Sequence, residues 1–122
     1  MSIKTKAIFP KRGEIYLVNF DPTIGSEIKK IRPALILQND ISNRYSPVTI
    51  VAAITSYEKD DKIYPNEVLV LRKGSVLEKD SLVLLNQIRT IDHKRLLKKL
   101  GQINPLALEE IDQALKISLG LM

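Results

Sequence analysis

One charged segment of the chain combines side chains that phosphate chemistry uses. It runs from Gly25 to Pro33 and holds a serine hydroxyl, a glutamate carboxylate and three cations. Arg32 lies at the end of this segment, where an apolar stretch begins. If the fold holds this guanidinium at the edge of a small barrel, its N–H donors match the geometry of phosphate oxygens. A solvated hairpin loop is an equally good interpretation of these residues taken alone.

A second candidate is the stretch Ala53-Ile54-Thr55-Ser56, where an apolar strand ends in two hydroxyls. Such hydroxyls are more often capping or turn residues than catalytic groups. The single histidine, His93, is of the type used most often as a general base near neutral pH. A lone histidine followed by Lys94 and Arg95 is, however, more often a surface residue.

Other routes to catalysis are disfavoured by what the sequence lacks. The absence of cysteine excludes disulfides, thiolate metal sites and cysteine nucleophiles, and one histidine without cysteine argues against a zinc site. The sequence has no glycine-rich phosphate loop and no recognisable carboxylate pair. We therefore expect neither a metal nor a cofactor.

Length and composition indicate one small domain. The chain has 122 residues, of which 44% are hydrophobic, so residues 1–122 suit a single modest core. The net charge of +5 favours a polyanion or an acidic protein as partner. Residues 1–11 form a basic N-terminal extension without the apolar run of a signal peptide, and no stretch reaches membrane-spanning length. We expect a cytoplasmic protein that does not enter the membrane.

The elements that must position these side chains are mostly strands. Short apolar, β-branched runs of strand length alternate with turn-forming residues, and no crossover helix separates most of them. They predict five strands, at Glu14–Phe20, Ala34–Leu37, Val48–Ile54, Glu67–Leu71 and Leu82–Ile88. Pairing should be largely antiparallel, which favours a small closed or half-closed barrel.

Helices are expected in three places. Residues Asp40–Tyr45 suit one or two helical turns, and a shorter turn is expected near Asp92. The long helix comes last, with Asn104 as N-cap and an apolar stripe of Leu108, Ile111, Leu115 and Leu119. This stripe should pack on the barrel or on a partner.

Five motifs occur in order along the chain at characteristic spacings. They are Arg12-Gly13-Glu14-Ile15-Tyr16, Gly25-Ser26-Glu27, Arg32-Pro33-Ala34-Leu35-Ile36, Ala53-Ile54-Thr55-Ser56 and Gln87-Ile88-Arg89-Thr90-Ile91-Asp92. Together they closely resemble the MazF/PemK toxin family, from about Lys11 to Leu121. The resemblance implies an SH3-like barrel with a C-terminal helix, a homodimer, sequence-selective cleavage of single-stranded RNA, and inhibition by an acidic, MazE-like antitoxin.

The resemblance also implies site residues. The catalytic arginine and threonine of the family fall on Arg32 and Thr55. Ser26 and Glu27 match the loop of the family pattern, and Gln87 and Arg89 match positions near its RNA groove. Arg32 suits stabilisation of charge on phosphorus, Thr55 suits orientation of a phosphate oxygen, and Glu27 is a candidate base for the RNA 2′-hydroxyl. The identity of the base stays open.

Further residues are candidates for RNA binding through their charge or their rings. Tyr57 and Tyr45 offer rings on which an unpaired base stacks, although a core or interface role is the commoner one for a tyrosine. Ser56 adds a hydroxyl beside Thr55. The cations expected to line one mouth of the barrel and to contact phosphates are Lys29, Lys30, Arg44, Lys59 and Lys62.

The sequence departs from the family pattern at two places, and two rival functions remain. Many relatives have a less charged stretch with glycine where this chain has Ile28-Lys29-Lys30-Ile31, and residues 1–11 are added at the front. One rival is a toxin of the same fold that poisons DNA gyrase, as in the related CcdB family. The other is an SH3-like module that binds nucleic acid or protein without chemistry.

Overall fold

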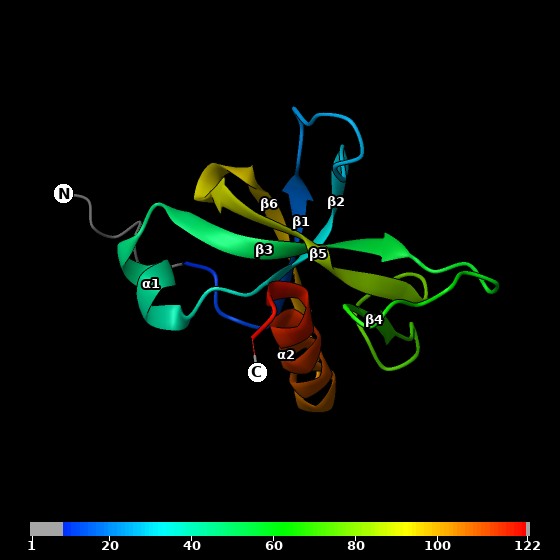
Figure 1. Cartoon of the computed structure of the whole chain (residues 1–122). Helices are drawn as coiled ribbons and strands as arrows, with labels where there is room; N and C mark the ends of the chain where they lie inside the picture. Colours follow the sequence, from blue (N-terminus) through cyan, green and yellow to red (C-terminus); the bar gives the residue numbers. More distant parts are fainter. Residues whose placement is uncertain (1–8, 122) are drawn as a thin grey trace.

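The computed structural model describes residues 9–121, which form six strands, two α-helices and one short 3-10 helix (Figure 1). In chain order these are β1 (Glu14–Asn19), β2 (Ile31–Ile36), α1 (Asp40–Tyr45), β3 (Val48–Ser56), β4 (Glu67–Val70), β5 (Ser81–Asp92), η2 (His93–Arg95), β6 (Leu96–Gln102) and α2 (Pro105–Leu119). The N-terminal extension expected at residues 1–11 lies mostly outside the described residues.

All the strands belong to one antiparallel sheet with the order β4-β5-β3-β2-β1-β6. Register shifts interrupt the β3–β5 ladder between Ala52 and Ala53 and the β1–β6 ladder at two places. Such irregularities increase local bending and twist, and Figure 1 shows the sheet strongly curved. The expected class, mainly β with a C-terminal helix in an SH3-like antiparallel arrangement, is confirmed. The sheet stays open, with β4 and β6 as its edges.

The five predicted strands are present, with shifted ends. Strand β2 begins at Ile31, earlier than predicted, and β5 extends to Asp92. Sequence analysis missed β6. This edge strand carries Lys98 and Lys99 and is largely exposed, so its sequence lacks the buried apolar alternation that marks a strand.

The core lies on both faces of the sheet because neighbouring residues of a strand point to opposite sides. On β2, Leu35 belongs to the cluster that α2 covers, whereas Ala34 and Ile36 belong to a second cluster with Phe20. Helix α2 packs against β4 and β5. Strands β2 and β3, which carry Arg32 and Thr55, therefore lie in the well-packed centre of the sheet.

The helices begin where the sequence predicts. Asn104 Oδ1 accepts a hydrogen bond from Ala107 N at 2.8 Å, and Gly120 ends α2 in the left-handed conformation. Ile111 is fully buried, whereas Leu119 is 58% exposed, so the last residue of the predicted apolar stripe does not pack on the sheet. The predicted helix at Asp40–Tyr45 and the turn near Asp92 are confirmed as α1 and η2. No helix within residues 9–121 is long and apolar enough to cross a membrane.

Candidate functional site

The two main candidate residues face each other across neighbouring strands. Strand β2 pairs with β3 so that Ala34 lies opposite Ala53, and the same register carried two residues further brings Arg32 opposite Thr55. A long hydrogen bond joins them, from Arg32 Nη1 to Thr55 Oγ1 at 3.4 Å. Arg32 Nε also donates to the carbonyl of Lys29 at 2.9 Å. The guanidinium is thus held at two points while part of it stays free for a ligand.

Arg32 and Thr55 line a pocket of about 490 Å³. Strand ends, the segment before β5 and edge strand β6 meet here. The charged side chains that line the pocket with Arg32 are Lys30, Lys79, Lys98 and Glu78. None of these lysines forms an ion pair with another residue in the part of the chain that the structure describes. An excess of unpaired cations in a concave site favours an anionic ligand.

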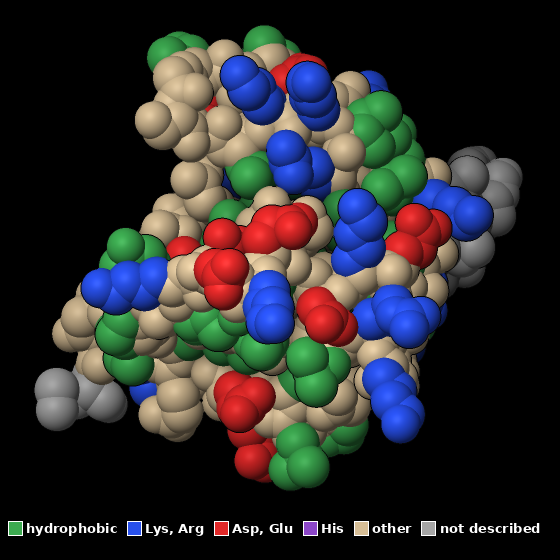
Figure 2. Space-filling view, turned by 90° about the vertical axis from the view of Figure 1, so that its right-hand side faces the viewer, with side chains coloured by type: hydrophobic (Ala, Val, Ile, Leu, Met, Phe, Trp, Pro, Cys, Tyr) green, Lys and Arg blue, Asp and Glu red, His purple; other side chains and the backbone are tan. Residues whose placement is uncertain are grey.

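Charge is unevenly distributed over the surface. On the face of the molecule in Figure 2, several Lys and Arg side chains lie in the upper part, toward the β1–β2 loop at the top of Figure 1. Asp and Glu side chains lie mostly across the middle and lower part of that face. The surface near the β1–β2 loop thus carries several cations and few acidic side chains, whereas further down this face Lys and Arg side chains lie among the acidic ones.

Glu27 lies outside this pocket. Its carboxylate accepts a hydrogen bond from Ile24 N at 2.9 Å and so closes the tip of the β1–β2 loop. Glu27 instead lines a separate pocket of about 300 Å³ together with Gln87 and Arg89. Ser26 is exposed at the same tip. The structure thus brings Arg32 and Thr55 together, whereas Glu27, the candidate base, lines a different pocket.

Gln87 and Arg89 are engaged with the backbone of the β1–β2 loop. Gln87 Oε1 accepts from Ile28 N at 3.2 Å, and its Nε2 donates to Ser26 O at 3.4 Å. The Arg89 guanidinium donates to the carbonyl of Phe20. Both side chains project from β5, which the sheet anchors, so they tether the loop that leads to Arg32.

The other predicted RNA-binding residues fall in different places. Ser56 lines the Arg32 pocket, and Lys29 is exposed next to Lys30 in the sequence. Tyr57 is half-buried, with its hydroxyl donating to Lys59 O at 3.1 Å. Lys62 is exposed further along the same connection.

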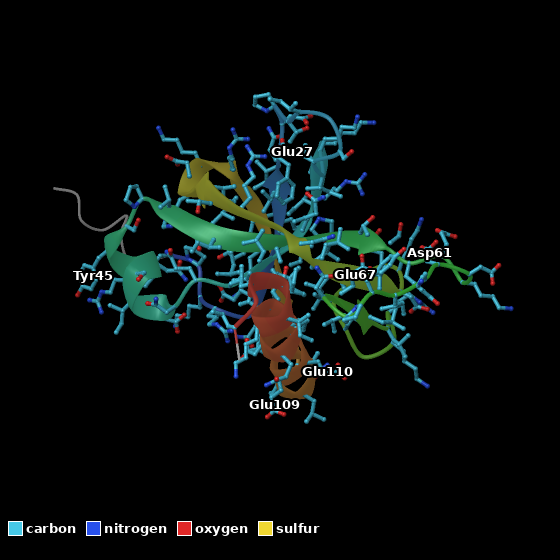
Figure 3. All side chains as sticks on the ribbon, viewed as in Figure 1. Glu27, Tyr45, Asp61, Glu67, Glu109 and Glu110 are labelled. Carbon is cyan, nitrogen blue, oxygen red and sulfur yellow. The ribbon has the colours of Figure 1, made fainter. Side chains whose placement is uncertain are left out.

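Arg44 lies far from these residues, on α1. Figure 3 shows Tyr45 of α1 and Glu27 of the β1–β2 loop in well-separated parts of the molecule. Arg44 stacks over the rings of Tyr45 and Phe9, with its Cζ 5.4 Å and 6.0 Å from their centroids. The expectation that Arg44 lines the same mouth as Lys29 and Lys30 is therefore wrong, and any contact of Arg44 with RNA stays a prediction about a separate surface.

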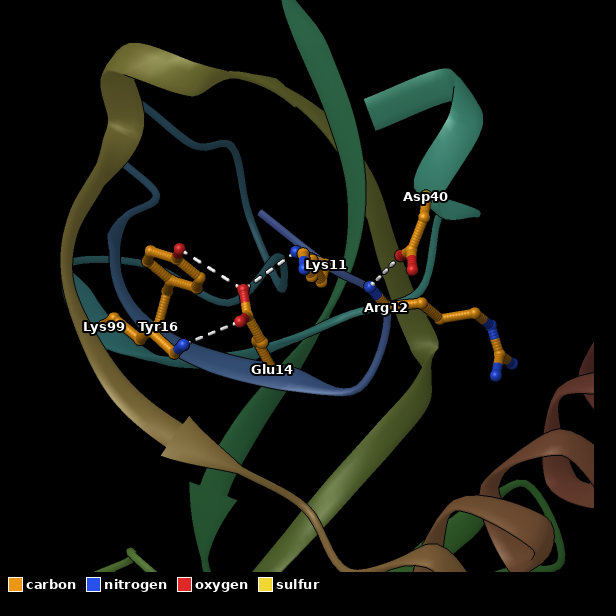
Figure 4. Close-up of polar contacts among 6 residues, drawn as sticks. All are labelled: Lys11, Arg12, Glu14, Tyr16, Asp40 and Lys99. Atoms are coloured by element: carbon orange, nitrogen blue, oxygen red, sulfur yellow. Dashed lines mark hydrogen bonds and ion pairs between the residues drawn. The ribbon is translucent and has the colours of Figure 1, made fainter. Parts of the chain in front are cut away.

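A polar cluster that sequence analysis did not single out lies beside α1 (Figure 4). Glu14, only 4% exposed, accepts hydrogen bonds from Lys11 N at 2.8 Å and Tyr16 Oη at 3.4 Å, and its Oε2 pairs with Lys99 Nζ at 2.7 Å. Burial raises the pKa of Tyr16, and the charge of Glu14 and its hydrogen bond raise it further. The cluster joins the start of β1 to edge strand β6.

His93 is not part of the Arg32 pocket. Its backbone N donates to Pro47 O at 2.9 Å, and its Nε2 is buried without a hydrogen-bond partner among the described residues. Within residues 9–121, no three His, Asp or Glu side chains gather into a set that would hold a metal ion.

Sequence analysis missed three residues of the pocket. Lys79 and Glu78 come from the connection before β5, and Lys98 comes from the strand that was not predicted. No local pattern marks them, because they approach Arg32 only through the fold.

Comparison with known proteins decides the family. Residues 11–119 match the family described as PemK-like, MazF-like toxin of type II toxin–antitoxin systems. The chain belongs to the PemK/MazF family. It is 45% identical over 112 residues to Endoribonuclease EndoA of Bacillus subtilis (strain 168), a match that covers 92% of this chain and 96% of the relative.

Solved structures of PemK/MazF toxins have the same fold. MazF of Deinococcus radiodurans (Form-I) matches with a TM-score of 0.78 and 28% identity, over 93% of this chain and 99% of that one. The MazE–MazF complex of the same organism (Form-II) matches with a TM-score of 0.72 and 25% identity, over 94% and 99%. The resemblance inferred from the five motifs is thus confirmed.

Arg89→Ala tests whether this arginine tethers the β1–β2 loop. Without the bond to Phe20, the loop should open more often, and trypsin should cut after Lys29 and Lys30 several-fold faster. Cleavage is followed by mass spectrometry under native conditions. Arg72→Ala, which changes an exposed arginine on another connection, should leave the rate unchanged. Equal rates in the Arg89 variant and the wild type would contradict the tether.

Proposed function

We propose that the chain is the endoribonuclease toxin of a type II toxin–antitoxin system and that it cuts single-stranded RNA in the Arg32 pocket. The observation that supports this most strongly is the pairing of Arg32 with Thr55 at 3.4 Å inside a cationic pocket. The family and the relative named Endoribonuclease EndoA indicate the class of reaction, cleavage of RNA. The guanidinium, hydroxyl and ammonium groups of the pocket suit this reaction.

The reaction is a transesterification within the RNA. The 2′-oxygen attacks the adjacent phosphorus, the bond from phosphorus to the 5′-oxygen breaks, and the products end in a 2′,3′-cyclic phosphate and a 5′-hydroxyl. Because RNA carries its own nucleophile, this chemistry needs no metal or other cofactor. The proton of the 2′-hydroxyl leaves to a base, and the departing 5′-oxygen takes up a proton.

Arg32 stabilises the negative charge that builds on the phosphate oxygens. A guanidinium stays protonated, so its role is electrostatic, and donors already held in place are most effective when charge develops in the transition state. Thr55 Oγ1 accepts from Arg32, which leaves its own proton free to bind a phosphate oxygen. The exposed lysines of the pocket attract the flanking phosphates.

The base is the open role. Glu27, the candidate from the sequence, would have to release Ile24 N and move into the Arg32 pocket to act. Glu78 is the only carboxylate that lines the Arg32 pocket within residues 9–121. We favour Glu78 as the proton acceptor on this ground of proximity.

Partners and setting follow from the family. We propose that residues 1–122 act as one toxin domain, that two copies form a homodimer, and that the dimer acts in the cytoplasm on selected sequences in mRNA. A MazE-like antitoxin that is acidic would complement the cationic surface near the β1–β2 loop and block RNA. The MazE–MazF structure matched above is a complex of this kind.

The two rival functions make less use of the site. A CcdB-like gyrase poison or a binding module without chemistry has no need for a guanidinium braced against a threonine inside a cationic pocket. Incubation of the purified chain with RNA in chelator separates the three. RNA cleavage supports the nuclease, gyrase arrest with intact RNA supports the first rival, and binding without product supports the second.

Arg32→Ala should lower kcat for RNA cleavage by about 100- to 1,000-fold, because the transition state loses its positioned donors. Single-turnover cleavage of a labelled RNA measures the loss, and thermal unfolding checks that the variant still folds. The matched control is Arg72→Ala, which removes an exposed arginine outside the pocket and should cleave normally. Wild-type rates with Arg32→Ala would show that the reaction occurs elsewhere.

Replacing the 2′-hydroxyl at the cut site by hydrogen should abolish cleavage, since the nucleophile is lost. The same RNA with the replacement one nucleotide further away should still be cut, also in the presence of chelator. Product ends are identified by mass spectrometry, where a 2′,3′-cyclic phosphate is expected. Cleavage at the deoxy position would exclude the proposed route.

A further inference from the structure

We propose that Asp21 is a positioning residue for Arg32 and that it acts through the peptide bond between Lys29 and Lys30. Asp21 Oδ1 accepts a hydrogen bond from Lys30 N at 2.9 Å. The carbonyl of Lys29 accepts the bond from Arg32 Nε, also at 2.9 Å. The inference rests on the function proposed above, because it gives Asp21 a role in placing the group that stabilises the transition state.

One rigid unit transmits the effect. The carbonyl of Lys29 and the N–H of Lys30 belong to the same planar peptide group, and in a trans peptide they point in opposite directions. When Asp21 holds the N–H, the carbonyl must therefore point the other way, to Arg32 Nε. A flip of this peptide would break both hydrogen bonds at once.

The hydrogen bond to Asp21 is needed because the backbone at Lys30 has a strained conformation. Lys30 has a φ of +68°, in the left-handed region that side chains with a β-carbon rarely adopt. Glycine adopts this region freely, and lysine does not. The ladder bond from Phe20 N to Lys30 O at 3.0 Å ties the other side of Lys30 to the end of β1. The hydrogen bond to Asp21 offsets the cost of a lysine at this position.

Asp21 is itself held in place. Its N–H donates to Asn19 Oδ1 at 3.1 Å, and the Arg95 guanidinium donates to the carbonyls of Asn19, at 3.0 Å, and of Asp21. Arg95 belongs to η2, between two strands of the sheet. A continuous set of contacts thus runs from the sheet through Asp21 to the peptide that supports Arg32.

The consequence concerns the direction of the guanidinium. With Nε bound to Lys29 O, Nη1 lies within hydrogen-bonding distance of Thr55 Oγ1, which lines the pocket with Arg32. Asp21 lines no part of this pocket, so its contribution is to geometry and not to contact with RNA. A negative charge near the RNA path would by itself weaken RNA binding, so the two roles predict opposite effects of removing it.

Four single and double variants form the test. Asp21→Ala removes the acceptor and should lower kcat by about 10- to 100-fold, with KM within about twofold. Asp21→Asn keeps an oxygen acceptor and should keep most of kcat. In the Asp21→Ala background, Lys30→Gly should restore kcat to at least about tenfold above Lys30→Ala, because only glycine adopts the left-handed conformation without cost. Both double variants lack the lysine ammonium, so the comparison isolates the backbone.

A second readout does not depend on activity. Solvent exchange of the Arg32 Nε proton, followed by NMR, should be faster in Asp21→Ala than in the wild type or Asp21→Asn. Equal kcat in the two double variants, or unchanged exchange and kcat in Asp21→Ala, would overturn the proposal. A wild-type chain that does not cut RNA would instead refute the proposed function, and the exchange rates would still decide the role of Asp21.

Discussion

The antiparallel pairing of β2 with β3 is the constraint on which the site depends. Its register, with Ala34 opposite Ala53, brings Arg32 and Thr55 together from positions far apart in the sequence. A slip of one residue would turn one member of the pair to the other face of the sheet. The buried side chains of Leu35 and Ile36 on opposite faces of β2 specify this register, so the packing of the core also places Arg32 beside Thr55.

Next to this pair, hydrogen bonds hold the β1–β2 loop against the sheet. It is held at its ends by backbone contacts to Phe20 and at its middle by Gln87 from β5. These hydrogen bonds restrict the conformation of the loop, as the hydrogen bonds between strands restrict the strands. The loop joins the sheet to Arg32 through Lys29, so its conformation and the position of the guanidinium change together.

The sequence predicted most of the fold, and it singled out the two residues, Arg32 and Thr55, that the structure brings into contact. β-Branched runs located five strands, and an N-cap with a following proline located α2. Strand β6 was missed because Lys98 and Lys99 stand where a buried strand would have apolar residues. The exposure of Leu119 was not predicted, because helical periodicity says which residues share a face but not where the covering sheet ends. The five motifs identified Arg32 and Thr55 only through the resemblance to a family.

The rest of the site depends on contacts that no local pattern records. Glu27 turns back to its own loop and Arg89 binds the carbonyl of Phe20, and the sequence predicted neither contact. Lys79 and Lys98 reach the pocket from segments far along the chain. Arg44 carries the same charge as Arg32 yet lies on α1, in a different pocket. The sequence indicated which charged side chains could bind RNA, but not where the fold places them or what they contact.

The most direct test of the central claim is a crystal structure of the chain bound to an RNA that lacks the 2′-hydroxyl at its cut site. We predict that the phosphate at that site lies within hydrogen-bonding distance of the Arg32 guanidinium and Thr55 Oγ1. A phosphate bound instead in the pocket of Phe9, Arg44 and Tyr45, with Arg32 free of RNA, would contradict the claim.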